Sequence, residues 1–271
     1  MNRSQTLTRL VMAMLLLFTL VPFVTLLSAA LQPVGDRPRG FSWPSNPQWG
    51  NFVEAYQVAD VTPLLKSSIL IVLGVVPISL LIAALAGYGL ASLSIPGGRW
   101  ILLLFIAGLT IPFESLITPL FFQMKALGLL NTRWAVILPL IGLFMPFGVF
   151  WMRSYFVSIA SEISEAARID GAGPWQAFWR VHLPLSRPAL ASLAILLFLW
   201  TWNQFILALV LIDDPSMRTV AGALGAFQSQ YDTNTVLLAA ISVLIMTPTI
   251  LVFLIFQRQF SRALLEGAVK G

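Results

Sequence analysis

The chain has 271 residues, of which 58% are hydrophobic and 10% are charged, and its mean hydropathy is +0.87. A soluble domain carries roughly 25% charged residues, so this composition excludes an ordinary soluble domain and indicates a polytopic membrane protein. The absence of Cys excludes disulfides, thiolate metal sites and Cys nucleophiles, and the single His argues against a zinc site.

The apolar runs have the length of membrane helices, because a bilayer core of about 30 Å needs about 20 residues per helix. Backbone groups left unpaired in lipid are costly, so spanning segments must be helices or closed barrels, and these runs are too long and continuous for barrel strands. We therefore predict an all-α fold with six transmembrane helices, at residues 10–31, 67–91, 100–122, 134–152, 189–212 and 237–256.

The first apolar run follows Arg3 and Arg9 and ends in Ser28-Ala29-Ala30, a pattern also found in cleaved signal sequences. The run is longer than the roughly 7 to 15 residues of a signal core, and its removal would leave five spans. We therefore expect it to be retained as the first span.

The charges outside the spans predict the topology. Six spans place both termini on one side, where ten Lys and Arg residues fall, against six on the opposite side. Positive loops face the cytoplasm, so we predict a cytoplasmic N-terminus (1–9), a permease domain (10–257) and a cytoplasmic tail (258–271). External loops then occupy 32–66 and 213–235, and a cytoplasmic loop occupies 153–188. The net charge of +5 reflects this topology, so no nucleic-acid partner is expected.

Three features lie outside the main cytoplasmic loop. The first external loop is rich in Pro and Gly and should contain a short amphipathic segment near residues 51–60. Ala83, Gly87 and Ala91 recur at four-residue spacing in the second span and favour close helix packing. In the second external loop, contact with an external binding protein or polar ligand is expected of Gln228, Gln230 and Tyr231. A connector with a short re-entrant helix is the alternative.

A polar island at residues 165–184 interrupts the apolar chain. On a helix from near Ser161, Ile163, Ala166 and Ala167 share one face, and the two alanines leave room for a close neighbour. Glu165 suits the positive N-terminal end of this helix.

A sharp turn should follow this helix, because Gly171 and Gly173 tolerate unusual backbone angles. Pro174 can open a second short helix with an aromatic face, and Pro184 ends the element. Such a charged, interrupted segment cannot cross hydrocarbon, so we interpret it as a docking surface.

At this loop the chain resembles the permease subunits of ATP-binding-cassette importers, which carry a Glu-Ala-Ala motif followed by a spaced Gly. The carbohydrate branch, with the smaller permease subunit of the maltose type, is most similar. The matching positions in the loop are Glu165, Ala166, Ala167, Asp170, Gly171, Gly173 and Pro184. Further matches are Pro112-Phe113-Glu114, Pro119, residues 128–132, Trp202-Asn203 and residues 267–271.

The resemblance implies a type I importer permease (MetI-like) fold in a bacterial or archaeal plasma (inner) membrane. Residues 161–185 would form a coupling helix seated in a cytoplasmic ATPase subunit, and the motif positions above would be its ATPase-coupling residues. In the tail, Glu266 and Lys270 would reach between two ATPase subunits. A second, homologous permease subunit and an extracytoplasmic solute-binding protein are the other implied partners, besides membrane lipid. Trp175 and Phe178 should wedge the loop against its own membrane helices.

The chain contains no Gly-x-x-x-x-Gly-Lys-[Ser/Thr] sequence, so it has no phosphate-binding loop of that type. We therefore expect a permease subunit that is not an enzyme and binds no cofactor, with ATP and Mg held by the partner ATPase subunits. The expected function is import of a sugar or sugar-like solute, with the loop transmitting ATPase movement to alternating access.

Polar groups within the spans are the candidates for a substrate pathway. Glu114 is the acidic residue in mid-span, and a structural carboxyl is the alternative for it. Trp202, Asn203 and Gln204 combine an aromatic face with amides, as a sugar site requires, and packing between permeases is the alternative. His182 is interpreted as structural.

Two other classes of function compete. An ion-coupled secondary transporter of a small polar solute should show ionisable residues at membrane depth or an internal repeat, and the chain offers Glu114 and no visible repeat. An intramembrane enzyme would need paired catalytic groups within the spans, which this sequence lacks. Among sugar oligomers, amino sugars, polyols and glycerol-phosphate-type ligands, the sequence favours none.

Overall fold

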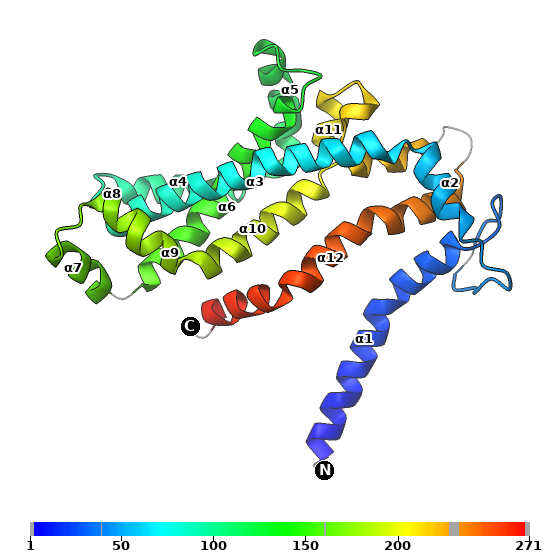
Figure 1. Cartoon of the computed structure of the whole chain (residues 1–271), viewed down its shortest axis with the longest axis horizontal. Coiled ribbons are helices and arrows are strands. Elements are labelled where there is room, and N and C mark those ends of the chain that lie inside the picture. The colour runs from blue at the N-terminus through cyan, green and yellow to red at the C-terminus, as the bar shows by residue number, and fades with distance from the viewer. Residues whose placement is uncertain (1–2, 39, 160, 228–232, 269–271) are drawn as a thin grey trace. The chain divides into compact units, whose positions relative to one another are not determined.

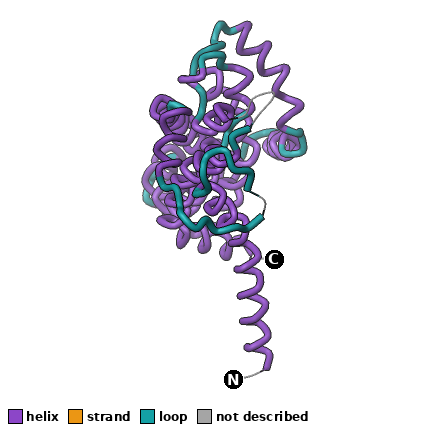
Figure 2. Tube along the Cα trace, turned by 90° about the vertical axis from the view of Figure 1, so that its right-hand side faces the viewer, coloured by secondary structure: helices purple, strands orange, loops and turns teal. Residues whose placement is uncertain are grey.

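A computed structural model describes residues 3–38, 40–159, 161–227 and 233–268, with only the backbone described for 3–4, 161 and 258–268. Every regular element in these ranges is helical (Figure 2), which confirms the predicted all-α class. The chain divides into two compact units, Met1–Thr62 with Gly222–Pro248, and Pro63–Ala221 with Thr249–Gly271.

The first unit contains α1 (Arg3–Ala30), α2 (Gly50–Val58) and the beginning of α12 (Thr235–Ala268). The beginning of α2 is tied to the end of α1 by the buried Asn51, whose amide donates to the carbonyl oxygens of Ala30 and Gln32, both at 2.8 Å. Helix α2 confirms the short helical segment predicted in this loop.

The second unit contains the site and most of the helices (Figure 1). Helices α3, α4, α6 and α10 run alongside one another in it, and two buried apolar clusters hold α3 and α6 to the helices around them, α10 in one cluster and α5 and α11 in the other. Its elements are α3 (Val61–Ser92), α4 (Gly98–Gly108), η1 (Phe113–Leu116), α5 (Ile117–Ala126), α6 (Trp134–Ser158), α7 (Ser161–Ile169), α8 (Pro174–Ala177), η2 (Phe178–His182), α9 (Leu183–Leu185), α10 (Arg187–Trp202), α11 (Ile206–Leu211) and η3 (Pro215–Met217), and η4 (Val220–Phe227) begins in it.

Small residues set the crossing of α3 and α6. A Cβ atom at Gly87 would lie 2.8 Å from the backbone nitrogen of Arg153 and from Cβ of Met152. One turn earlier, Ala83 is fully buried and its Cβ lies 3.0 Å from the position a Cβ would take at Gly148. The small-residue spacing in the second predicted span therefore does what was expected, since it lets the two backbones approach closely.

Some of the predicted membrane spans are not continuous helices in the structure. Four helices are long and apolar enough to cross a membrane, or up to six if two bent pairs each count as one span. The pairs are Gly98–Gly108 with Phe113–Ala126, and Pro174–Leu185 with Arg187–Trp202, and the second pair includes part of the predicted cytoplasmic loop. The third predicted span, 100–122, is broken between α4 and η1, and the two parts are bent by 99°. The break falls before Pro112, which has an extended backbone and no N–H to continue a helix.

The fifth predicted span, 189–212, is also interrupted. Helix α10 ends at Trp202 and α11 begins at Ile206. Two amide side chains take over the local hydrogen bonds: Asn203 donates to the carbonyl of Leu199 at 2.8 Å, and Gln204 accepts from the Leu207 N–H at 3.2 Å. Side-chain bonding of this kind competes with the helix ladder, so the amides at 203 and 204 interrupt an otherwise apolar helical run.

The last predicted span continues further than expected. Helix α12 does not stop near residue 256 but runs on to Ala268, through most of the predicted tail.

Candidate functional site

The predicted coupling loop folds as a compact element, here called the foot, that runs from Ser161 to Leu185. Its first helix, α7, ends at Ile169 and is followed by Gly171, whose φ of +77° is available to glycine at little cost. Ala172 donates to the carbonyl of Ala167 at 2.9 Å, and Gly171 donates to that of Arg168 at 3.0 Å. These two bonds form a Schellman motif, so the chain ends α7 and reverses within two residues.

The second glycine of the turn behaves differently. Gly173 caps α8 with an extended backbone (φ −67°, ψ 165°), and Pro174 occupies the first turn of the helix. A Cβ atom at Gly173 would meet nothing within 4 Å. The fold of this chain therefore requires glycine at 171 but not at 173, and a requirement at 173 would have to come from a partner.

A π-helical turn, η2 (Phe178–His182), precedes the short helix α9. Pro184 lies in α9 and cannot donate to the carbonyl four residues earlier, with which its ring would also clash. The wider π turn accommodates this proline, and the foot then joins α10 at Arg187.

Aromatic packing anchors the foot to the helices beneath it. Phe178 is fully buried, with its ring centroid 5.2 Å from that of Tyr88 on α3. The Tyr88 hydroxyl donates to the carbonyl of Pro174 at 3.0 Å, and the Tyr155 hydroxyl on α6 donates to that of Leu185 at 2.8 Å. The foot is thus fixed to α3 at Pro174, near its middle, and to α6 at Leu185, its C-terminal end.

His182 lies in the same core. Its ring centroid is 4.9 Å from that of Tyr88, and its Nε2 is 3.4 Å from Oγ of Ser164 on α7. Burial lowers the pKa of His182 below 6.5, because the charged imidazole loses hydration. These contacts agree with the structural role predicted for this residue.

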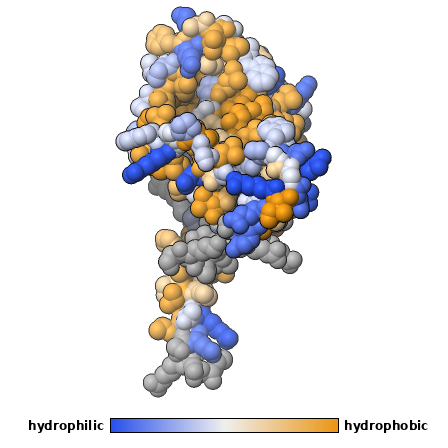
Figure 3. Space-filling view, turned by 90° about the vertical axis from the view of Figure 1, so that its left-hand side faces the viewer, coloured by the Kyte–Doolittle hydropathy of each residue, from blue (hydrophilic) through white to orange (hydrophobic). Residues whose placement is uncertain are grey.

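The outer surface of the foot combines charges with apolar side chains (Figure 3). Glu162, Glu165 and Asp170 are exposed, and none makes a hydrogen bond or ion pair with another side chain that the structure describes. Ile169 is 86% exposed beside them. Unpaired charges around an exposed isoleucine are typical of a surface that contacts a partner.

The prediction that Trp175 and Phe178 both wedge the foot against its own helices is correct for one of the two residues. Phe178 wedges the foot against its own helices as expected, whereas Trp175 is 63% exposed. Its ring stacks on Phe178 with centroids 6.1 Å apart, but α8 is a single turn and buries one face only. Trp175 therefore belongs to the outer surface and Phe178 to the core.

The structure brings the predicted coupling residues into one hairpin. Glu165 and Ala166 are exposed on α7, whereas Ala167 is buried beneath them. The turn holds Asp170, Gly171 and Gly173, and Pro184 is exposed on the return of the chain.

The predicted pathway residues lie at two separate places along the chain, at η1 and at the end of α10. Glu114 is exposed in η1, at the break of the third predicted span. Trp202 is 4% exposed and stacks on Phe198 of the same helix with centroids 5.5 Å apart, so its ring packs within this chain. Asn203 is exposed and Gln204 half-buried, at the break between α10 and α11.

Five other predicted contacts cannot be placed. Gln228, Gln230, Tyr231 and Lys270 lie outside the described residues. Glu266 lies in the last part of α12, where the structure describes the backbone but not the side chains.

A hydrogen-bonded clamp at the other end of the second unit was missed at the level of sequence. Asn131 has φ of +61°, its amide donates to a carboxylate oxygen of Asp213 at 3.0 Å, and its side-chain oxygen accepts from the Asp213 N–H at 2.5 Å. Arg218 donates to the carbonyls of Ile212 and Asp213 at 2.8 and 3.1 Å. The signal was Asn131 itself, because Asn tolerates a left-handed backbone better than most residues.

Long apolar helices joined through a polar, partly unpartnered foot define a multi-pass membrane permease that is built to contact another subunit. Residues 79–266 match the family described as binding-protein-dependent transport system inner membrane component, and the chain belongs to this family.

The relatives have names that agree with this family. The diacetylchitobiose uptake system permease protein NgcG of Streptomyces coelicolor is 34% identical over 93% of this chain and 84% of its own length. The trehalose transport system permease protein SugB of Mycobacterium tuberculosis is 33% identical, with 94% and 93% covered. The arabinooligosaccharides transport system permease protein AraQ of Halalkalibacterium halodurans is 35% identical, with 92% and 91% covered.

A solved structure has the same fold. A bacterial ABC transporter involved in the import of the acidic polysaccharide alginate contains a chain that aligns with a TM-score of 0.78 at 24% identity. The alignment covers 96% of this chain and 99% of that chain.

Proposed function

We propose that this chain is a transmembrane subunit of an ATP-driven importer that takes up a sugar or sugar-like solute delivered by an extracytoplasmic binding protein. The observation that carries the proposal is the foot, a rigid element whose outer charges have no partner among the described side chains. Membership of a binding-protein-dependent family supports the transport role and weighs against an ion-coupled secondary transporter. The names of the relatives support a carbohydrate substrate.

In the proposed mechanism the foot sits in a cleft of one of two ATPase subunits, which bind ATP and Mg. Closure of the ATPase pair moves the foot, and the hydrogen bonds from Tyr88 and Tyr155 connect that movement to α3 and α6. The burial of Phe178 prevents the foot from sliding independently of these helices. Nucleotide and loaded binding protein then bias the same two-state equilibrium between outward and inward access.

The remaining parts of the assembly follow the predicted topology. Both termini and the foot face the cytoplasm of a bacterial or archaeal cell, and a second, homologous permease completes the pathway. Exposed Glu114 and Asn203 are the proposed pathway groups of this chain. The C-terminal tail, with Glu266 and Lys270, contacts the ATPase pair, and Gln228, Gln230 and Tyr231 contact the binding protein.

The experiment replaces Gly173 with Trp in the assembled transporter. Because its backbone is extended and its surroundings are open, the variant should fold and insert like the natural chain. A bulky ring on the outer surface should instead displace the ATPase subunit, so we expect loss of ATPase on co-purification and uptake reduced at least tenfold. Gly50 is a matched control, because a Cβ atom there also meets nothing within 4 Å and it lies on the predicted external side.

The measurements are the ATPase subunit retained in mild detergent and uptake into reconstituted vesicles. Gly50→Trp should retain the ATPase. If Gly173→Trp keeps both the ATPase subunit and full uptake, the foot is not the docking element and the proposed coupling is wrong.

A further inference from the structure

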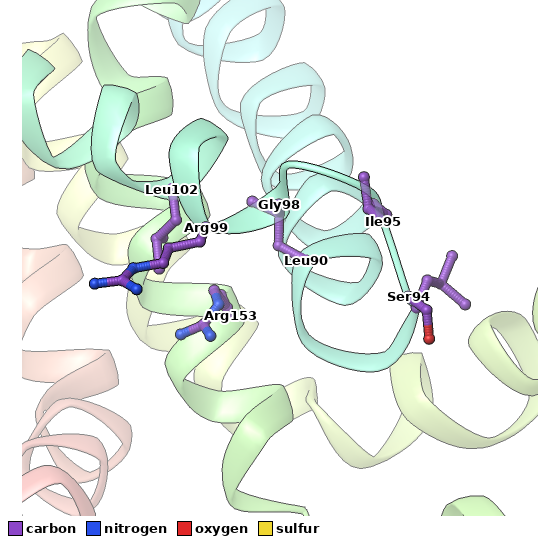
Figure 4. Close-up of a pocket in the computed structure, with 8 residues that line it drawn as sticks. Leu90, Ser94, Ile95, Gly98, Arg99, Leu102 and Arg153 are labelled. Atoms are coloured by element: carbon purple, nitrogen blue, oxygen red, sulfur yellow. The ribbon is translucent and has the colours of Figure 1, made fainter.

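A cavity of about 260 Å³ lies where α3 ends and α4 begins (Figure 4). Its walls are apolar on one side and strongly basic on the other. In Figure 4, Leu90 and Ile95 lie on one side, and Arg99 and Arg153 lie on the other beside Leu102; Leu93 also lines the cavity.

Local structure fixes the cavity. Gly97 caps α4 with φ of +75°, which reverses the chain after α3. A Cβ atom at Gly98 would lie 3.6 Å from Leu90 and 3.7 Å from Ile95, so the turn folds tightly back onto the end of α3. On the other side, the close crossing of α3 and α6 at Gly87 fixes the backbone of Arg153.

The cavity has an excess of positive charge. No acidic residue lines it, and neither Arg99 nor Arg153 bonds to another side chain in the described part of the chain. Arg99 also lies in the first turn of α4, where the helix dipole is itself positive. The two guanidinium groups extend toward the same side in Figure 4. Guanidinium groups match phosphate oxygens in geometry as well as in charge.

The surroundings indicate where that phosphate comes from. Trp100, next to Arg99, is 74% exposed at the beginning of α4, as an aromatic residue at the membrane interface would be. Leu93 and Ile95 line the cavity and are also 39% and 38% exposed, so acyl chains could cover them. A free phosphate ion would have no use for these apolar walls.

We propose that this cavity binds the phosphate headgroup of an anionic phospholipid. Arg99 and Arg153 hold the phosphate, and the apolar wall contacts the upper part of the acyl chains. Basic pockets between membrane helices recognise anionic headgroups in this way. The assignment to the cytoplasmic leaflet rests on the proposed topology, whereas the binding itself does not.

The test measures lipid retained by the purified full-length chain with its partner permease, by native mass spectrometry without nucleotide. Phosphatidylglycerol, phosphatidylcholine and inorganic phosphate are offered separately. We expect retention of phosphatidylglycerol over phosphatidylcholine, and about a 30-fold loss of that affinity in the double variant Arg99→Gln/Arg153→Gln, since each basic group contributes about a factor of five. Arg187→Gln removes an exposed arginine outside the cavity and should leave the preference unchanged.

Equal retention of phosphatidylglycerol by the double variant would overturn the proposal. Inorganic phosphate competing as well as the lipid would assign the site to a free anion instead. Loss of the lipid when an ATPase subunit binds would assign the two arginines to an acidic group of that subunit and also overturn it. None of these outcomes bears on retention of the ATPase by the foot, so the two proposals fail independently.

Discussion

The two ends of the second unit use their polar residues in opposite ways. At the clamp, Asn131 and Arg218 bond to the backbone of the loop after α11, and Asp214 accepts from the N–H of Ser216 at 2.9 Å. At the foot, Glu165 and Asp170 are exposed without such partners among the described side chains, and aromatic rings provide the cohesion.

The two ends show two uses of polar residues: at the clamp they hold a loop in place, and at the foot they face a partner. Polar groups that already form internal hydrogen bonds stabilise local geometry, but they have few free donors and acceptors for a partner. An element held from beneath by buried rings keeps its shape while its outer charges stay available. The clamp is therefore built for stability and the foot for contact, and substitutions at the two ends should have different consequences.

Phe178→Ala should have the largest effect on stability. Truncation of a fully buried phenylalanine costs about 3–5 kcal/mol, and it removes the ring on which Tyr88 and Trp175 pack. Thermal unfolding of the detergent-purified transporter measures the loss. Trp175→Ala is the matched control, because that ring is mostly exposed, and it should reduce ATPase retention more than stability. Equal destabilisation by both variants would contradict the division between core and outer surface.

Asn131→Gly tests the clamp. Glycine keeps the left-handed backbone but removes both bonds to Asp213, so a loss of about 1–3 kcal/mol is expected from thermal unfolding. Asn131→Ala should cost more, because it adds backbone strain of about 1–2 kcal/mol.

Both Asn131 variants should retain the ATPase subunit, because the clamp and the foot lie at different ends of the second unit. Release of the ATPase by Asn131→Gly at a temperature where the permease is folded would contradict the claim that the clamp serves stability and the foot serves partner contact.

Tyr88→Phe should weaken the attachment of the foot to α3. The variant keeps the ring that contacts Phe178 but loses the bond to the Pro174 carbonyl, for an expected cost of about 1 kcal/mol. Coupling should suffer more than stability, seen as less ATPase activity stimulated by loaded binding protein. Tyr56→Phe, which removes an exposed hydroxyl bonded to Thr62, is the control and should change neither. Normal stimulation in Tyr88→Phe would show that this bond transmits nothing.

The smallest expected effect is the pH dependence of stability that His182 contributes. Because burial lowers the pKa of His182, the folded chain binds fewer protons at this site than the unfolded chain. Stability from this site should thus be full above the ordinary His pKa of about 6.5 and decline as the pH falls below it. Thermal unfolding at about pH 7.5 and about pH 5.5 measures the decline, and His182→Gln should reduce it. An identical pH dependence in that variant would assign the effect to other groups.

Much of this protein could be predicted from sequence because the signals are local. Apolar runs of bilayer length predicted helices, and Gly171 with Pro174 predicted a turn followed by a second helix. The role of Trp202 could not be resolved in this way, because its burial depends on how α10 packs against the other helices.

The sequence by itself determined that this is an all-helical membrane protein with a polar foot, because hydrophobic length and turn chemistry act over a few residues. Only the tertiary structure decided that Phe178 faces inward and Trp175 outward, and that Asn131 meets Asp213 across 82 positions of the chain. It also placed Arg99 and Arg153 in one cavity. Such pairings depend on which helices cross and how closely, and no local pattern encodes that geometry.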